Sequence, residues 1–140
     1  DKTEPGSVVF LAADSLAVRG QVTVGALPDM VTFTPDGEYL LVANEGEPNE
    51  DYSKDPEGSV SVVDLRNGVA GATVRTADFS AYVGREQQLR ADGVRIFGRL
   101  RNGTESSAAQ DFEPEYIAVA GPRAYVTLQE NNAVAVLNVG

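Results

Sequence analysis

The sequence predicts an all-β fold built from repeated antiparallel units. Short runs rich in valine, threonine and other strand-forming residues alternate with polar positions along most of the chain. Turn-forming segments such as Pro35-Asp36-Gly37 and Asn67-Gly68 separate consecutive runs. A pattern of proline, acidic residue, strand, turn, strand, polar loop and strand occurs twice, beginning at Pro28 and again at Pro114. Such internal repetition is typical of folds that stack similar units.

The first part of the chain contains the clearest strand patterns. Six segments have the length and alternation of β-strands, and they are residues 7–11, 16–24, 30–33, 40–44, 59–65 and 72–76. The third and fourth segments form a hairpin, because Pro35 presets the turn and Gly37 tolerates a positive φ. We therefore predict two strands of one unit within residues 7–24 and a complete four-stranded unit over residues 28–77.

Residues 78–110 interrupt the repeat and form an insert. Residues 80–90 contain good helix formers and predict a short helix that ends near Asp92-Gly93. Residues 94–100 alternate again, and residues 101–110 are expected to be a polar loop. The insert is locally basic through five arginines, which are Arg85, Arg90, Arg95, Arg99 and Arg101. A solvated helix face explains this charge more simply than recognition of an anion.

The last part of the chain repeats the complete unit. Residues 113–119, 123–129 and 132–139 follow the spacing of residues 27–33, 39–45 and 58–65. Four short antiparallel strands per unit, joined by polar turns, are typical of a β-propeller blade. Residues 111–140 are then a partial blade. Because a closed propeller has at least about four blades, we expect a fragment of about two to three blades. Its open sheet edges would pair with the remaining blades or with other copies.

Composition excludes several classes of function. A net charge of -10 disfavours binding to nucleic acids and to anionic membranes. There is no cysteine and no histidine, so these residues cannot supply a disulfide, a serine triad or a histidine-based zinc site. No apolar run reaches the length of a membrane span, so we expect no membrane insertion within this segment. No catalytic motif is present.

An acidic loop lies between two of the expected strands. Within residues 45–57 it carries six carboxylates, which are Glu45, Glu47, Glu50, Asp51, Asp55 and Glu57, and only Lys54 offsets them. A run of like charges is usually a solvated, flexible segment. Alternatively the loop binds a hard cation, because calcium requires several carboxylate and carbonyl oxygens at once.

Propeller geometry would bring this loop together with other acidic connections. The connection that enters the first strand of a blade and the one that joins its second and third strands emerge on the same face. These connections carry Asp29, residues 45–57, Asp111, Glu113, Glu115 and residues 129–132. Oxygen ligands alone suit calcium or magnesium. The predicted ligands of a Ca²⁺ site are Glu45, Glu47, Asp55, Glu57, Glu113 and Glu115. A solvent-exposed strand entry, stiffened by Pro114, is the simpler explanation of Glu113 and Glu115.

Three segments, residues 27–65, 93–98 and 111–139, resemble the choice-of-anchor I domain family, and the resemblance covers nearly the whole chain from Ser7. The motifs that carry the resemblance are Asn44-Glu45-Gly46-Glu47, Asp55-Pro56-Glu57-Gly58 and Glu113-Pro114-Glu115-Tyr116. One departure is Phe112, where a smaller aliphatic residue is expected. The resemblance implies a seven-bladed propeller with YVTN-like repeats on an exported protein that is periplasmic, extracellular or anchored at the cell surface. The family includes mesenchyme-specific cell-surface glycoproteins, and some relatives are labelled alkaline phosphatase-like.

Three classes of function remain. The first is a binding or adhesion module whose acidic face binds calcium or a partner. The second is a metal-dependent phosphoesterase, in which carboxylates hold a metal that activates water and the remaining site residues lie outside this segment. The third is a scaffold without a ligand. The acidic face and the missing catalytic groups favour the first.

Overall fold

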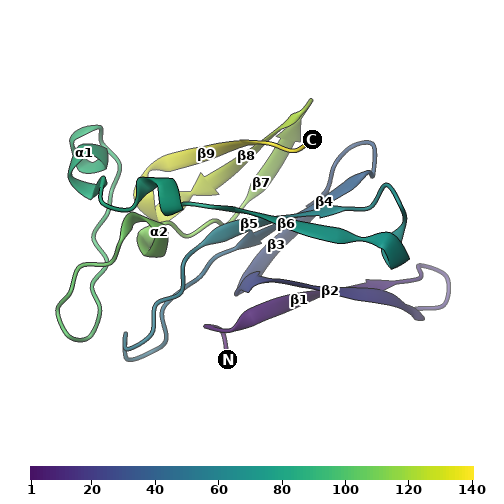
Figure 1. Cartoon of the computed structure of the whole chain (residues 1–140), viewed down its shortest axis with the longest axis horizontal. Helices are drawn as coiled ribbons and strands as arrows, with labels where there is room; N and C mark the ends of the chain where they lie inside the picture. Colours follow the sequence, from purple (N-terminus) through teal and green to yellow (C-terminus); the bar gives the residue numbers. More distant parts are fainter.

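The computed structural model describes all 140 residues and confirms the all-β class. Nine strands form three antiparallel sheets, in which each strand pairs with its neighbour along the chain (Figure 1). The first sheet contains β1 (Pro5–Leu11) and β2 (Val18–Ala26). The second contains β3 (Pro28–Phe33), β4 (Tyr39–Asn44), β5 (Ser59–Asp64) and β6 (Thr73–Asp78). The third contains β7 (Ile117–Ala120), β8 (Arg123–Leu128) and β9 (Ala133–Asn138).

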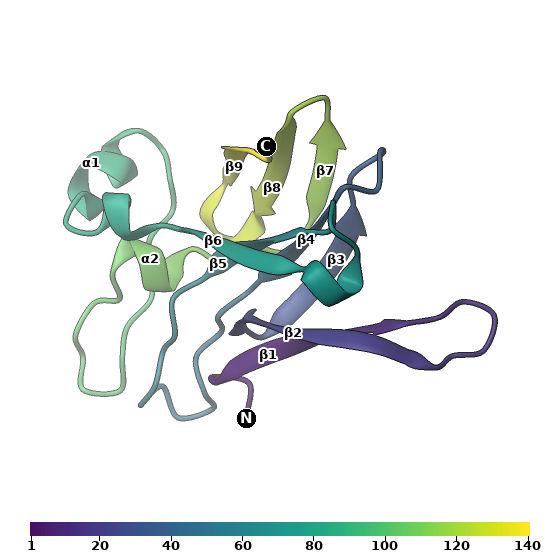
Figure 2. The same cartoon turned by 45° about the vertical axis from the view of Figure 1, so that its right-hand side comes forward.

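The three sheets pack in series, with the second sheet between the other two (Figure 2). All residues of β4 and all but one of β5 are buried, so both faces of the second sheet are covered at its centre. On the face toward the first sheet, Gly25 lies directly against Asn44 and Ser59. A Cβ at position 25 would lie 2.7 Å from each of those side chains, so the close approach of the two sheets requires glycine.

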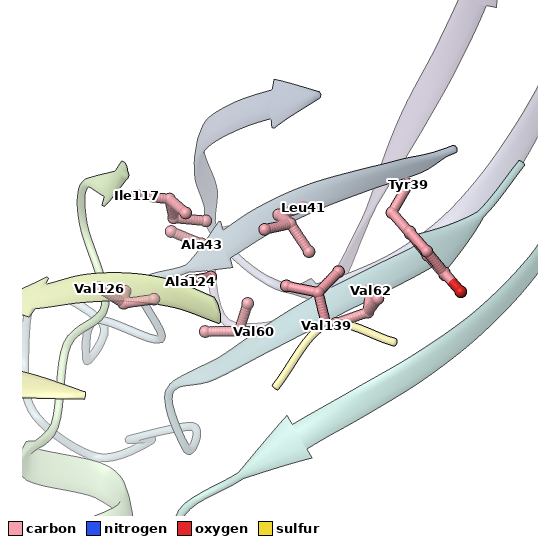
Figure 3. Close-up of a cluster of buried hydrophobic side chains, with 9 residues drawn as sticks. All are labelled: Tyr39, Leu41, Ala43, Val60, Val62, Ile117, Ala124, Val126 and Val139. Carbon is pink, nitrogen blue, oxygen red and sulfur yellow. The ribbon is translucent and has the colours of Figure 1, made fainter. Parts of the chain in front are cut away.

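The other face of the second sheet packs on the third sheet and forms the main core (Figure 3). The second sheet contributes Tyr39, Leu41, Ala43, Val60 and Val62. Ile117, Ala124, Val126 and Val139 come from the third sheet and the residue after it. Alternation along the strands places these apolar side chains on facing surfaces, and their removal from water stabilises the contact between the sheets.

The insert packs around a second apolar cluster built on three aromatic rings. The rings of Phe79 and Phe112 meet edge to face at 5.2 Å, and Tyr82 lies 6.0 Å from Phe112. Ile96 and Leu128 complete this cluster. Phe112 is 3% exposed and packs between the insert and the third sheet.

The helical part of the insert is shorter than predicted. Residues 80–90 do not form one helix, because a 3₁₀ turn (Ser80–Tyr82) is separated from helix α1 (Glu86–Ala91) by Gly84, whose φ is 80°. Residues 94–100 alternate in sequence but form no strand, and only an isolated bridge joins Arg99 to Glu105. The expected loop 101–110 contains the start of helix α2 (Ala108–Asp111), which begins with a capping box between Ser107 and Gln110.

Strand boundaries differ from the prediction by a few residues. β2 begins at Val18 rather than residue 16, because Leu16 adopts a φ of 56° in the turn before it. The connection after Asn67-Gly68 is longer than a tight hairpin turn, since a 3₁₀ turn (Val69–Gly71) follows Gly68 before β6 begins.

Candidate functional site

The acidic loop and the insert lie side by side at one end of the sheets (Figure 2). The backbone N–H of Arg101 donates to the carbonyl of Tyr52 over 2.8 Å, and its guanidinium donates to Asp51 over 2.8 Å. Ser106 donates to Oδ2 of Asp55 over 2.8 Å, and Gln110 donates to the carbonyl of Asp55 over 2.9 Å. These hydrogen bonds hold residues 51–55 of the acidic loop against the insert.

A cleft of about 400 Å³ lies between these two segments. The acidic side chains that line it are Glu47, Glu50, Asp55, Asp111, Glu113 and Glu130. Lys2 and Arg99 bring positive charge to the same cleft. The rings of Tyr52 and Phe97 also line it, and each of these residues is 52% exposed. The cleft is thus predominantly acidic.

Four glutamates from two connections come together at this cleft, and two of them, Glu47 and Glu113, line it. Burial, together with the charges of Glu47, Asp29 and Glu115, raises the pKa of Glu45 to about 7. Burial, followed by the charges of Glu45 and Glu47, raises the pKa of Glu113 to about 7. Burial also raises the pKa of Glu115. The contact between the second and third sheets therefore brings like charges into one partly dehydrated space.

Lys2 is the cation that contacts this group. Its ammonium donates a hydrogen bond of 2.5 Å to the Glu47 carboxylate, and that bond raises the pKa of Lys2. Both side chains are well exposed, so the ion pair contributes little to stability. One ammonium does not neutralise the neighbouring glutamates.

Asp55 and Asp111 lie deeper in the cleft. One oxygen of Asp55 accepts from Ser106, whereas Oδ1 is buried without a hydrogen-bond partner. Burial raises the pKa of Asp55. Asp111 is 7% exposed and accepts hydrogen bonds from the backbone N–H groups of Phe97 and Gly98 and from the amide of Asn131.

The structure brings together some of the six predicted ligands and separates others. Glu45, Glu47, Glu113 and Glu115 form one electrostatically coupled group. Asp55 lies in the cleft beside Ser106, and Glu57 is exposed and is not among the charges that shift these pKa values. No three acidic side chains are arranged to hold a metal ion as they stand.

Asp111 and Glu130 lie on the acidic connections expected from the sequence, but neither is among the six predicted ligands. Lys2 was not predicted to contact the site at all. No sequence signal points to the contact of Asn131 with Asp111, because the burial of Asn131 depends on how the insert packs on the third sheet.

The fold and the site define an all-β domain of serially packed sheets with an acidic end. The sequence model of the choice-of-anchor I domain matches residues 1–140, and the chain belongs to that family. Membership identifies a surface-associated or exported protein. Searches of curated proteins and of solved structures found no match. None of the helices has the length and apolar character needed to cross a bilayer.

Proposed function

We propose that this chain is a binding module of an exported protein, periplasmic, extracellular or on the cell surface, and that its acidic end binds Ca²⁺. One observation carries the proposal, namely that the packing of the second sheet on the third brings carboxylates of two connections together at one cleft, which Glu47 and Glu113 line. Burial and like charge there raise the pKa values of Glu45 and Glu113 to about 7. Crowded carboxylates repel one another. A divalent cation would relieve that repulsion more completely than Lys2 does, and it would compete with protons for the same oxygens.

The coupled glutamates are the proposed first ligands. Glu45, Glu47 and Glu113 would coordinate the ion, and Glu115 lies next to them. Glu47 would exchange its contact with Lys2 for the cation. The Oδ1 atom of Asp55 is buried and accepts no hydrogen bond. A cation, or a water molecule bound to it, would provide the partner that this oxygen lacks. Calcium accepts about six to eight oxygens in flexible geometry, so small movements of these side chains can assemble its shell.

The serial packing of the sheets supports a propeller as the architecture of this module. We assign residues 7–24 to strands of one blade, 28–77 to a full blade, 78–110 to the insert and 111–140 to a partial blade. The first strands, β3 and β7, approach one another, as innermost strands of adjacent blades must. The same arrangement gathers the acidic connections at one end.

Calorimetric titration with CaCl₂ tests the cation site directly. We expect binding by the unmodified chain and an affinity at least about tenfold weaker in the Glu45→Gln and Glu113→Gln variants. Glu57→Gln is the matched control, because it removes one negative charge from the same loop outside the coupled group. Equal weakening of Ca²⁺ binding in all three variants would show that net charge, and not a specific site, attracts the ion. Unchanged binding in Glu113→Gln would reject Glu113 as a ligand.

The phosphoesterase alternative stays a prediction. Metal-dependent turnover of a phosphomonoester that is lost in Glu113→Gln would favour it over a binding role alone.

A further inference from the structure

The acidic cleft is formed by connections of the chain and not by strands. Its two walls are residues 47–55 of the acidic loop and residues 97–113, which comprise the end of the insert and the connection that follows it (Figure 2). Lys2 and Glu130 complete the lining. The cleft is therefore separate from the strand faces on which the sheets pack. Its volume of about 400 Å³ falls within the range of small-ligand pockets, about 300–1,000 Å³.

One alkyl ammonium group already lies in this cleft. Lys2 lines it, and its ammonium donates a hydrogen bond of 2.5 Å to the Glu47 carboxylate. That hydrogen bond, followed by the charges of Glu45 and Glu113, raises the pKa of Lys2. Lys2 and Glu47 are both well exposed, so an ammonium from another molecule can take the place of Lys2 at low cost. The chain itself thus identifies a chemical group that the cleft accepts.

Further acceptors remain in the cleft beyond the contact with Lys2. Six acidic and two basic side chains line it. Among the acidic ones, Asp55 has a buried Oδ1 that accepts no hydrogen bond. An ammonium group has three N–H donors and no acceptor, so it binds where carboxylate oxygens are in excess. The lining of the cleft has this excess.

Two aromatic rings, Tyr52 and Phe97, line the same cleft and are half exposed. The backbone holds Tyr52 in place, because its N–H donates to the carbonyl of Asn49 over 3.0 Å and its carbonyl accepts from Arg101 over 2.8 Å. The guanidinium of Arg95 lies 4.3 Å from the centre of the Phe97 ring. Rings attract organic cations, and alkyl stems pack on them. Calcium takes oxygen ligands only, so the rings indicate an additional, organic ligand.

The path of residues 1–4 indicates that this ligand belongs to a polypeptide. Two ion pairs join this segment to the acidic loop, one between Lys2 and Glu47 and one between Glu4 and Lys54. The segment therefore lies along the loop as a bound peptide would. A free amine would form only the contacts of its ammonium groups.

We infer that the acidic cleft binds a lysine side chain of a partner protein, which replaces Lys2. The incoming ammonium donates to the Glu47 carboxylate, and its alkyl stem packs against the ring of Tyr52 or Phe97. This inference rests on the proposed role of the chain as a binding module, but it does not require Ca²⁺. Lys2 then acts as an internal competitor that lowers the affinity for the partner.

Calorimetric titration with a blocked peptide of alternating glycine and lysine, with two lysines, tests this site. The buffer contains EDTA and little salt, so the result is independent of the Ca²⁺ titration. We expect the unmodified chain to bind the peptide. Lys2→Gln should bind it about two- to fivefold more tightly, because the internal competitor is removed. Lys54→Gln is the matched control, since it removes the same charge outside the cleft and should change the affinity less.

A second pair of variants tests the aromatic contact. Phe97→Leu should weaken peptide binding about two- to fivefold, because leucine keeps the apolar surface but cannot attract a cation through a ring. Phe33→Leu is the control, since Phe33 is 57% exposed and lies outside the cleft. Circular dichroism verifies that each variant folds.

Two further probes identify the bound group. The same peptide with acetylated lysines should not bind, because it has lost its ammonium groups. Free 1,5-diaminopentane carries the same two charges and should bind more weakly than the peptide. The inference would be overturned by an unmodified chain that does not bind the peptide, by equal affinities of Lys2→Gln and Lys54→Gln, or by equal affinities of the two phenylalanine variants. Diamine binding as tight as that of the peptide would also overturn it.

Discussion

The side-chain amide of Asn131 donates a hydrogen bond of 2.9 Å to the carboxylate of Asp111, and both residues are buried. The same amide donates to the backbone carbonyls of Arg95 and Asp111, each over 2.8 Å. Asp111 in turn accepts from the backbone N–H groups of Phe97 and Gly98. This network joins the insert to the third sheet, and it fixes one wall of the acidic cleft.

Replacement of Asp111 by alanine should destabilise the fold by about 3 kcal/mol. The change leaves the backbone N–H groups of Phe97 and Gly98 without their acceptor, and each unsatisfied buried donor costs about 1–3 kcal/mol. The Asn131 amide loses one contact but keeps the carbonyls of Arg95 and Asp111 as acceptors. Urea denaturation measures the loss. Glu105→Ala is the control, because its ion pairs with Arg90 and Arg99 are exposed and should contribute less than about 1 kcal/mol. Equal stability of the two variants would contradict the assigned role of Asp111.

Gly58→Ala should cost about 2 kcal/mol or more. A Cβ at position 58 would lie 2.0 Å from the carbonyl oxygen of Phe112 and 2.7 Å from the ring of Pro114, so the backbone must move. The shift would also strain the hydrogen bond from the N–H of Gly58 to the carbonyl of Ala109. Gly140→Ala, which meets no atom within 4 Å, should leave the thermal midpoint unchanged. If the thermal midpoint of Gly58→Ala equals that of Gly140→Ala, position 58 does not pack tightly against Phe112 and Pro114.

Stability should fall as the pH rises from about 4.5 to about 7. The folded-state pKa values of Glu45 and Glu113 are raised from 4.5 to about 7, so the folded chain holds protons that the unfolded chain releases in this window. Both side chains are partly solvated and coupled to each other, which reduces the expected loss to about 1–2 kcal/mol in total.

Denaturation at a series of pH values checks this dependence. Glu45→Gln and Glu113→Gln should each flatten the decline, because an amide does not titrate. Asp64 provides a contrast, since its hydrogen bond with Arg66 lowers its pKa to about 2, and its contribution is lost only as the pH falls below about 4. A stability that rises between pH 4.5 and 7 in the unmodified chain would contradict the predicted charge crowding.

Phe112→Leu should destabilise the insert by about 1–2 kcal/mol. The leucine is smaller than the phenylalanine and loses the edge-to-face contacts with Phe79 and Tyr82. Thermal unfolding followed by tyrosine fluorescence measures the change. Phe33→Leu is the control, because Phe33 is 57% exposed and should be replaced at little cost. A larger loss at Phe33 than at Phe112 would be inconsistent with this packing.

The repeated strand patterns made the three sheets predictable, because alternation and turn chemistry are local properties. Residues 94–100 show where such reasoning fails. Their alternation suggests a strand, yet the N–H groups of Phe97 and Gly98 donate to the side chain of Asp111 instead of to a neighbouring strand. That partner is distant in sequence. The start of α2 could have been predicted from the sequence, because Ser107 and Gln110 have the spacing of a capping box.

The candidate site was predictable only in its chemistry. An acidic loop and a second acidic connection are visible in the sequence, but the pairing of Glu45 with Glu113 depends on how the second sheet packs on the third. The position of Lys2 depends on the path of the chain before β1. Charges near one another in space, rather than along the chain, decide which carboxylates are crowded.

Within each sheet, every strand after the first pairs with its immediate predecessor, and this order affects how the protein can fold during its synthesis. Every hairpin can close as soon as its second strand has left the ribosome. Each later sheet can then pack on the sheet that formed before it. Such short-range closure favours rapid folding. The nascent chain can therefore acquire its structure vectorially, from the amino terminus onward, while translation continues.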